Sequence, residues 1–374
     1  MTRQFRTGNH TLVRALNRSI ILNQLRLGSL SRADLAARSG LNKTTVSSLV
    51  DELIAHQFVR EIGPNASAGG RPAIPLELNP VAGCIVGVEI GVGYLNVALT
   101  DFCAGILWRR QLPIGMVDTQ RQIISRAMTL VRQALQRGER TGTRLLGIGI
   151  AIPGLVDSTS GTVVYAPNLA WRNVPLGQIF GQKFNAPVLV DNDANAAALA
   201  ERYMGAAQDV SNYIHVVANV GIGAGLVLDG RVFHGATGYA GEAGHMTLDP
   251  DGPQCQCGNR GCWEKLASQN AVIERVRQSQ SASRAVLTEG ADDLCLQSIV
   301  AAARQRDVVM LQALEETGRY LGIGIANLVN TFNPELVVLG GALSLAEDFL
   351  TPVIQEVMLQ RTMSGPREVT QFVV

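Results

Sequence analysis

The chain has 374 residues, of which 17% are charged and 5% aromatic, and its formal net charge is only +1. This length allows two or three domains with sizeable cores, and the composition is typical of a soluble α/β protein rather than a disordered, fibrous or disulfide-rich one. No apolar run is long enough for a membrane span, and the N-terminus lacks the apolar core of a signal peptide, so we expect a cytoplasmic protein.

The charge is unevenly distributed along the chain. Residues 1–80 contain ten Lys and Arg against five Asp and Glu, a net charge of +5, and because the whole chain carries +1, the rest carries −4. A basic first domain on a mildly acidic body indicates that only the first domain binds a polyanion. Pro80 and Gly83 mark the boundary, so we predict domains at residues 1–80 and 81–374.

The first domain has the pattern of consecutive short helices. Apolar residues recur at helical spacing from Asn9 to Leu27, and Ser31 with Asp34 forms a capping pattern for a second helix. Asn42 can cap a third helix, whose apolar residues would face inward. These apolar residues are Val46, Leu49, Val50 and Leu53. The opposite face is small and polar and suits a DNA major groove. Its candidate DNA contacts are Lys43, Thr44, Thr45, Ser47 and Ser48.

Two strand-like runs follow, at residues 58–62 and 73–78, and the loop between them is rich in Gly, Pro and Ala and carries Arg71. This order predicts a winged helix-turn-helix in which Arg71 reaches a minor groove or a phosphate. A helical bundle that binds a protein instead of DNA is the alternative.

The body begins with a predicted hairpin at residues 81–101, and Leu145–Val156 is expected to form a buried strand. A further strand, Ala186–Val190, ends in Asp191-Asn192-Asp193-Ala194-Asn195 and leads into an Ala-rich helix. Polar residues at a strand-to-helix junction are well placed to line a cleft. The structural alternative is that Asp191 or Asn192 merely caps the helix.

Residues 241–264 contain a candidate metal site. Three thiols lie within eight positions, and a histidine lies ten residues before the first of them; together they supply the four ligands of a tetrahedral structural zinc. These ligands are His245, Cys255, Cys257 and Cys262. Gly258 and Gly261 allow the backbone to fold tightly enough. A disulfide with one spare thiol is the alternative, and it requires an oxidising compartment. The remaining cysteines, Cys84, Cys103 and Cys295, are expected to be small core residues.

Towards the C-terminus, Ile299–Val329 predicts one or two amphipathic helices that contain Gly318, Gly322 and Gly324, which allow close packing. A strand is expected at Leu336–Leu339, and Gly340-Gly341 is expected to open another helix.

The pattern Glu242-Ala-Gly-His245, followed by Cys255-x-Cys-Gly-x-x-Gly-Cys262-x-Glu264, resembles the ROK family, named for repressors, open reading frames and kinases. The resemblance covers nearly the whole chain, and within the family the chain is most similar to the xylose- or glucose/N-acetylglucosamine-type repressors. It implies an α/β protein with an N-terminal winged helix-turn-helix and a two-lobed, actin-like (ribonuclease H-like) sugar-kinase fold. Family members usually continue with a closing helix beyond Val374, so we expect that the chain is truncated or its second lobe less stable.

The resemblance also implies functional roles. Asp193 matches the general base that takes a proton from the sugar hydroxyl in the family's kinases, and His245 would bind zinc through one nitrogen while lying beside the sugar. The sugar-binding positions implied in this way are Asn168, Asn192, Asp193, Glu242, His245 and Glu264.

The phosphate-binding segments depart from the family's kinases. Where those kinases have Asp-x-Gly-Gly-Thr, this chain has Glu89-Ile90-Gly91-Val92-Gly93, and Asn219-Val220 replaces the start of a later Gly-Thr-Gly. Because phosphoryl transfer depends on positioning and charge stabilisation, these changes argue against it, and ATP and Mg²⁺ are not expected as cofactors. These Gly-rich segments could also be no more than tight hairpins.

We therefore expect a sugar-responsive repressor of carbohydrate uptake or metabolism genes. It would bind operator DNA as a homodimer or tetramer, take a monosaccharide effector into its cleft, contain structural zinc and have no membrane partner. The first alternative is an ATP-dependent sugar kinase of hexokinase type with an attached DNA-binding domain, with Asp193 as its base. In a second alternative, a protein partner replaces the sugar as the signal.

Overall fold

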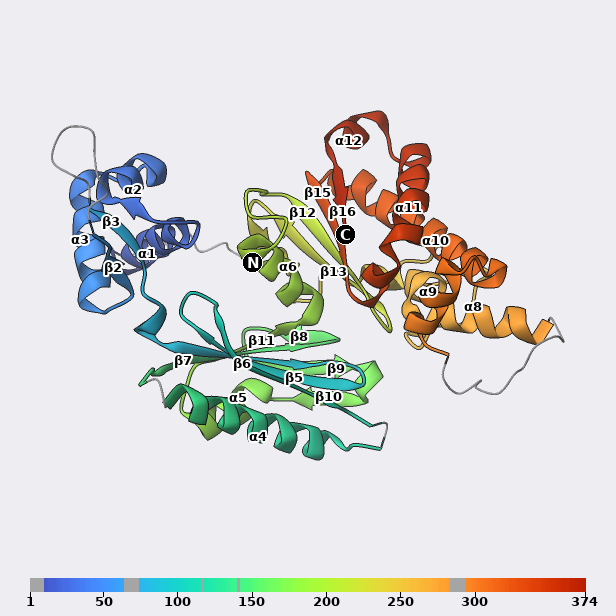
Figure 1. Ribbon diagram of the computed structural model, residues 1–374, viewed down its shortest axis with the longest axis horizontal. Coiled ribbons are helices and arrows are strands. Elements are labelled where there is room, and N and C mark those ends of the chain that lie inside the picture. Colours follow the sequence, from blue (N-terminus) through green and yellow to red (C-terminus); the bar gives the residue numbers. More distant parts are fainter. Residues whose placement is uncertain (1–9, 64–73, 116, 140–141, 283–293) are drawn as a thin grey trace. The chain divides into compact units, whose positions relative to one another are not determined.

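The computed structural model describes residues 10–63, 74–115, 117–139, 142–282 and 294–374 (Figure 1). The chain divides into two compact units. Unit 1 comprises residues 1–150 and 179–189, and unit 2 comprises residues 151–178 and 190–374. In the described parts of the chain, no helix combines the length and the apolarity that a membrane span requires.

The first part of unit 1, which we call the head, comprises residues 10–78 and packs small helices against a short antiparallel sheet of order β1-β3-β2. Its elements are α1 (His10–Arg26), β1 (Leu30–Ser31), α2 (Arg32–Ser39), α3 (Lys43–Ala55), β2 (Val59–Glu61) and β3 (Pro75–Leu78). The residues predicted to face inward from α3 are at most 4% exposed, so this prediction is confirmed. The pairing of β1 with β3 was not predicted, because two residues carry no readable period.

Both predicted helix caps in the head are present. Ser31 and Asp34 form a complete capping box at the start of α2, and Asn42 Oδ1 accepts a hydrogen bond of 2.7 Å from the Thr45 backbone N–H at the start of α3. In α1, by contrast, the inward residues are Ile21 and Leu25. The apolar residues that make its first half look helical in the sequence, Leu12, Val13, Leu16 and Ile20, are 38–51% exposed.

The second part of unit 1 is an α/β lobe that begins with η1 (Pro80–Ala82). Its sheet has the order β11-β7-β4-β5-β6, with β4, β5 and β6 forming an antiparallel meander. The strands are β4 (Cys84–Ile90), β5 (Tyr94–Asp101), β6 (Ile106–Pro113), β7 (Leu145–Ile152) and β11 (Val188–Asn192); the helices are α4 (Gln120–Glu139) and α5 (Leu176–Phe184). The predicted hairpin at residues 81–101 is thus confirmed as β4 and β5.

Unit 2 contains a sheet of order β14-β13-β12-β15-β16 and a smaller antiparallel sheet of order β10-β9-β8. The large sheet consists of β12 (Tyr213–Ala218), β13 (Ile222–Leu228), β14 (Arg231–Val232), β15 (Leu336–Gly340) and β16 (Gln371–Val373). The small sheet consists of β8 (Leu155–Asp157), β9 (Thr162–Ala166) and β10 (Trp171–Val174), with η2 (Pro167–Leu169) between β9 and β10. Helix α6 (Asp193–Met204) packs on β12 and β13.

The remaining helices of unit 2 cover the large sheet and pack on one another. They are η3 (Ala243–His245), α7 (Trp263–Ala267), α8 (Gln269–Ala282), α9 (Leu296–Arg304), α10 (Val308–Phe332), η5 (Ala342–Ala346), α11 (Glu347–Arg361) and α12 (Ser364–Val369). As the sequence indicated, glycines let α10 approach its neighbours: a Cβ added at Gly324 would lie 2.1 Å from the Trp263 ring, and one at Gly322 would lie 2.7 Å from Val357.

Two expectations about local structure are wrong. The run Leu145–Val156 is not one strand: β7 ends at Ile152, and the chain bends at Gly154, whose φ of 107° suits glycine, before β8 begins. Of the three scattered cysteines, only Cys84 is buried, whereas Cys103 and Cys295 are exposed. A small apolar residue type fits a core but does not require one, so composition could not decide their burial.

Candidate functional site

In the head, α3 presents a small polar surface to solvent. Lys43, Thr44 and Ser48 are exposed, Thr45 and Ser47 are half-buried, and the apolar residues of the helix point the other way. Arg71 lies outside the described residues. The polar surface of α3 is therefore available for contact with a partner, as the sequence predicted.

Two arginines of α1 hold α3 in place through one carboxylate. Arg14 Nη2 lies 2.6 Å from Glu52 Oε2, and Arg18 Nη1 lies 2.6 Å from Glu52 Oε1. Arg14 also donates to the Ser48 hydroxyl over 3.4 Å, so one residue of the polar surface is oriented by α1. Arg14 and Arg18 thus form ion pairs within the head. The sequence alone does not distinguish such arginines from those that could bind a DNA phosphate.

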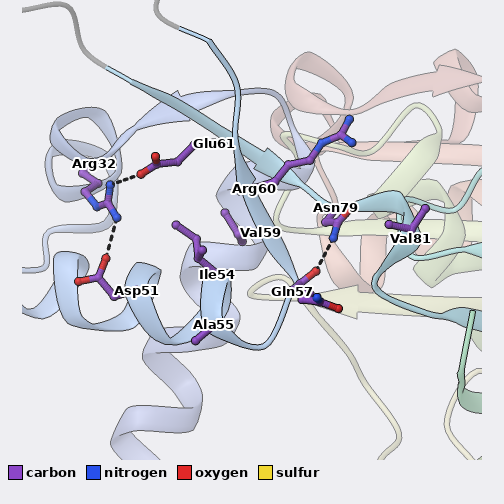
Figure 2. A pocket seen from close by; sticks show the side chains of 10 residues that line it. All are labelled: Arg32, Asp51, Ile54, Ala55, Gln57, Val59, Arg60, Glu61, Asn79 and Val81. Atoms are coloured by element: carbon purple, nitrogen blue, oxygen red, sulfur yellow. Dashed lines mark hydrogen bonds and ion pairs between the residues drawn. The ribbon is translucent and has the colours of Figure 1, made fainter.

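The head also has a hollow of about 600 Å³, which Figure 2 shows from close by. Both arginines that line it pair with acidic residues: Arg32 lies 2.7 Å from Asp51 and 2.8 Å from Glu61, and Arg60 lies 2.6 Å from Glu77. At its other end, Asn79 donates to the Gln57 carbonyl over 2.7 Å. Since both lining arginines already have acidic partners, their charges weigh against an anion site in this hollow.

In unit 2, the junction of β11 and α6 is a compact polar turn. Asn192 Oδ1 caps α6 by accepting from the backbone N–H groups of Ala194 (2.8 Å) and Asn195 (3.3 Å), and its Nδ2 donates to the Gly154 carbonyl over 3.0 Å. The capping alternative therefore applies to Asn192, whose side chain holds the turn together. Asp193 is the first residue of α6 and is half-buried.

Strand β13 supports this turn and the segment that contains Glu242. A Cβ at Gly225 would lie 2.4 Å from the Ala194 carbonyl oxygen of α6, and one at Gly244 of η3 would lie 2.0 Å from the Ile222 carbonyl oxygen of β13. Only glycine permits these approaches. Gly225 thus serves close packing against α6, and the segment that begins at Asn219 lies in the antiparallel hairpin of β12 and β13.

The predicted metal ligands come together. One ligand atom from each of His245, Cys255, Cys257 and Cys262 lies within 4.8 Å of the others. The tight turn uses glycine as predicted: Gly258 has a φ of 97°, and Gly261 has a φ of 60° with a Cβ position 1.5 Å from the Asp249 carbonyl oxygen. Burial raises the pKa of the Cys255 thiol to about 12.

The two nitrogens of His245 face different groups. Nδ1 lies 3.7 Å from Cys255 Sγ and 3.7 Å from Glu264 Oε1, whereas Nε2 lies 3.8 Å from Glu242 Oε2. Burial raises the pKa of Glu242, although its side chain is 40% exposed to solvent. Nδ1 is therefore the nitrogen on the cysteine side, and Nε2 with Glu242 forms a polar pair beside it.

Asn168 lies in η2, between β9 and β10, and is exposed to solvent. It belongs to unit 2, as do all the other sugar-site positions that the resemblance implied. Glu242 and Glu264 each lie close to His245, whereas Asn168 does not contact these three residues within the part of the chain that the structure describes.

In the hairpin of β4 and β5, the residues that would have to be open to bind a phosphate are in contact with other side chains of the chain. Glu89 Oε1 accepts from the Tyr94 hydroxyl over 2.5 Å, and Oε2 accepts from Asn96 Nδ2 over 3.2 Å. The Tyr94 ring lies across Gly91, where an added Cβ would come within 2.2 Å of it. The carboxylate is thus engaged by the chain itself and the loop is covered by an aromatic ring.

Asn219 is also engaged. Its Oδ1 accepts from the Ala342 backbone N–H over 2.7 Å, and the Gln269 N–H donates to its carbonyl over 2.9 Å. Asn219 therefore ties the end of β12 to the turn after β15. Neither role was predicted from the sequence: Asn219 binds Ala342, which is 123 positions away in the chain, and the contact of Tyr94 with Glu89 depends on how the hairpin orients its side chains.

Comparisons with known proteins agree with these observations. The model of the ROK family matches residues 85–374. The putative xylose repressor of Caldicellulosiruptor sp. (strain Rt8B.4) is 39% identical over 358 residues, which are 95% of this chain and 90% of that protein.

Two solved structures extend the comparison to the fold. A ROK family transcriptional regulator, a homologue of the Escherichia coli MLC protein, matches with a TM-score of 0.83 at 31% identity, over 96% of this chain and 91% of that chain. A ROK family glucokinase from Streptomyces griseus, in complex with glucose and AMPPNP, matches with a TM-score of 0.69 at 31% identity, over 78% of this chain and 94% of that chain. By sequence and by its sugar-kinase-like α/β fold, the chain belongs to the ROK family.

Proposed function

We propose that this protein is a sugar-responsive DNA-binding repressor of genes for carbohydrate uptake or metabolism. The observation that carries the proposal is the presence, in one chain, of a basic head with an exposed polar helix and a kinase-like body whose polar cluster surrounds Glu242 and His245. The similarity to a putative xylose repressor and to a ROK transcriptional regulator, over 95% and 96% of this chain, supports it.

We assign residues 1–80, which include the head, as a winged helix-turn-helix domain with α3 as the helix that enters the major groove. Helices α2 and α3 follow one another through Gly40, and β2 and β3 form the strands on either side of the proposed wing. The proposed DNA contacts are Lys43, Thr44, Thr45, Ser47, Ser48 and, from the wing, Arg71. Two heads of a homodimer, or of a tetramer, would match a two-fold operator.

We assign residues 81–374 as the sugar-binding domain. Its proposed sugar contacts are Asn168, Asn192, Asp193, Glu242, His245 and Glu264. Clustered carboxylate and imidazole groups suit a polyol, because each hydroxyl needs a partner when it leaves water. Asn192 would contribute mainly by holding the turn, since both ends of its amide already bind backbone groups.

The donor set of residues 241–264 fits structural zinc. Three thiols and one imidazole nitrogen, gathered within 4.8 Å, are typical of a closed tetrahedral site. His245 would use Nδ1, which faces the cysteines, and its Nε2 would remain on the side of Glu242. Bound zinc would stabilise the fold of this loop, and His245 would thereby join the metal site to the sugar site.

The second candidate function is an ATP-dependent sugar kinase, and the match to a glucokinase is the observation that favours it. Asp193 would be its general base. The hydrogen bonds of Glu89 to Tyr94 and Asn96 weigh against it, because a carboxylate that binds two protein donors is less available to a nucleotide-bound metal.

Fluorescence anisotropy of the purified protein on DNA from upstream of its own gene tests the repressor function. Xylose, glucose and N-acetylglucosamine are titrated one at a time without nucleotide. We expect one sugar to release the DNA, since an effector acts through its different affinity for the two states. An unaltered operator affinity with every sugar, together with sugar-dependent ADP release in a coupled assay, would favour the kinase.

Asp193→Ala separates the two roles of the chain. We expect the variant to bind operator DNA as the wild type does and to lose sugar-induced release, because the hydroxyl partner is removed from unit 2 and the head is untouched. Lys43→Ala is the matched control, with weaker operator binding and an unchanged affinity for the sugar. Weakened operator binding by Asp193→Ala itself would contradict this separation.

A further inference from the structure

A histidine–aspartate contact joins two segments of unit 2 that flank the proposed sugar site. His234 Nε2 lies 3.0 Å from Asp191 Oδ2, and the two residues are 43 positions apart in the chain. About a third of each side chain is exposed, 34% for His234 and 31% for Asp191. The contact is therefore tertiary, and it is partly exposed to solvent rather than buried in the core.

Asp191 uses its other oxygen to organise the turn before α6. Its Oδ1 accepts from the Asn192 backbone N–H over 2.8 Å and from Asn195 Nδ2 over 3.2 Å. Asn195 is only 3% exposed, so this end of the network is anchored in the interior. Both oxygens of Asp191 are thus occupied, and the residue fixes the backbone from which Asp193 projects.

His234 is itself held in a closed loop. The Phe233 N–H donates to the Leu226 carbonyl of β13 over 2.7 Å, and the Ala240 N–H donates to the His234 carbonyl over 3.1 Å. Gly235, with a φ of 70°, allows the turn that follows the histidine. The loop closed in this way leads through Gly241 directly to Glu242.

We propose that His234 is a positioning residue of the sugar site. Through its contact with Asp191, His234 connects the loop that leads to Glu242 and His245 with the turn that carries Asp193. The proposed sugar-binding residues of both segments are thereby held in place before the sugar binds. Such preorganisation raises affinity because the ordering does not have to occur on binding. The proposal rests on the proposed function of this site as a sugar site.

Two substitutions of His234 test the proposal in the full-length protein. His234→Leu removes the donor, whereas His234→Gln retains an N–H donor at a similar reach. By isothermal titration calorimetry with the sugar that releases operator DNA, we expect the leucine variant to bind about tenfold more weakly or worse, the cost of losing a hydrogen bond to a charged group. The glutamine variant should recover most of the affinity, with zinc content and sugar-free operator affinity unchanged in both.

Hydrogen–deuterium exchange supplies a readout that needs no sugar. In the leucine variant, the backbone amides of residues 191–195 should exchange faster than in the wild type, and in the glutamine variant they should not. A leucine variant that binds sugar as the wild type does, or a glutamine variant as weak as the leucine variant, overturns the proposal. If the wild type binds none of the three sugars, the proposed function fails, and unchanged exchange at residues 191–195 then overturns the positioning role independently.

Discussion

At the scale of single residues, the metal cluster combines buried and exposed ligands. Cys255 and Cys262 are 3% and 0% exposed, whereas Cys257 is exposed. Burial raises the pKa of Cys255 to about 12, so in the absence of a cation this thiol is protonated at neutral pH. Binding of the proposed zinc would therefore displace protons, and the affinity for zinc would rise with pH.

Cys257→Ser tests the metal site with little disturbance of packing, because Cys257 is exposed. We expect the purified variant to lose its zinc, as measured by elemental analysis, and to have a lower Tm, since metal binding contributes to folding. Cys103→Ser is the matched control: Cys103 is an exposed cysteine outside the cluster, and its replacement should change neither value. Full zinc content in the Cys257 variant would contradict the ligand assignment.

His215 gives a pH-dependent contribution to stability. It lies on β12, is 5% exposed, and packs against Gly340 of β15, where an added Cβ would lie 2.5 Å from its Nε2. Burial lowers its pKa from 6.5, and Glu201 and the Ala197 backbone oppose that effect only in part. Below about pH 6.5 the unfolded chain binds a proton that the folded chain does not, so the free energy of unfolding falls as the pH decreases.

His215→Leu should remove this contribution. Urea midpoints measured by circular dichroism at pH 7, 6 and 5 are expected to fall less steeply with decreasing pH for the variant than for the wild type. Equal slopes for the two proteins would show that His215 does not titrate differently in the folded and unfolded states. His10→Leu, which changes an exposed histidine of α1, is the control for losing a histidine.

At the scale of elements, the start of α3 depends on one cap. Asn42 accepts from the Thr45 N–H, and the following residues include the proposed DNA contacts Lys43 and Thr44. Asn42→Ala should destabilise the head by about 1 kcal/mol, the usual loss for an N-cap. Fraying of this turn should also weaken operator binding in the anisotropy assay. Asn42→Ser, which restores a capping oxygen, should recover both, and an Ala variant with unchanged stability and operator affinity would contradict the role.

At the scale of the whole molecule, the head is connected to the lobe of unit 1 by packing as well as by the chain. The rings of Phe58, just before β2, and Phe102, just after β5, have centroids 5.2 Å apart. The Arg144 guanidinium lies 5.7 Å from the Phe58 centroid, and the Phe102 N–H donates to the Pro80 carbonyl over 3.2 Å. Phe58 follows α3 closely, so this contact links the proposed recognition helix to the body.

Phe58→Ala should loosen this link, because an aromatic pair contributes about 0.5–1.5 kcal/mol beyond its buried area. We expect sugar-free operator binding to change little, whereas the ratio of operator Kd values with and without sugar should decrease several-fold. Phe58→Tyr keeps the ring and serves as the control. A ratio equal to that of the wild type would mean that coupling between sugar and DNA does not pass through this contact.

The sequence by itself determined the features that depend on neighbours along the chain. The capping box at Ser31, the cap at Asn42, the inward residues of α3 and the hairpin of β4 and β5 follow from short-range hydrogen bonding and periodicity. The clustering of His245, Cys255, Cys257 and Cys262 was also predictable from the sequence, because their spacing is local.

Only the tertiary structure decided how residues remote in the chain use their polar groups. It showed that Asn192 binds the Gly154 carbonyl and that Asp191 contacts His234. These partners are 38 and 43 positions apart, and such distant pairs leave no pattern in a sequence. The structure also showed that the apolar residues in the first half of α1 are exposed and that the Tyr94 hydroxyl binds Glu89. Burial and pairing are properties of the packed chain, and packing is settled by every element at once.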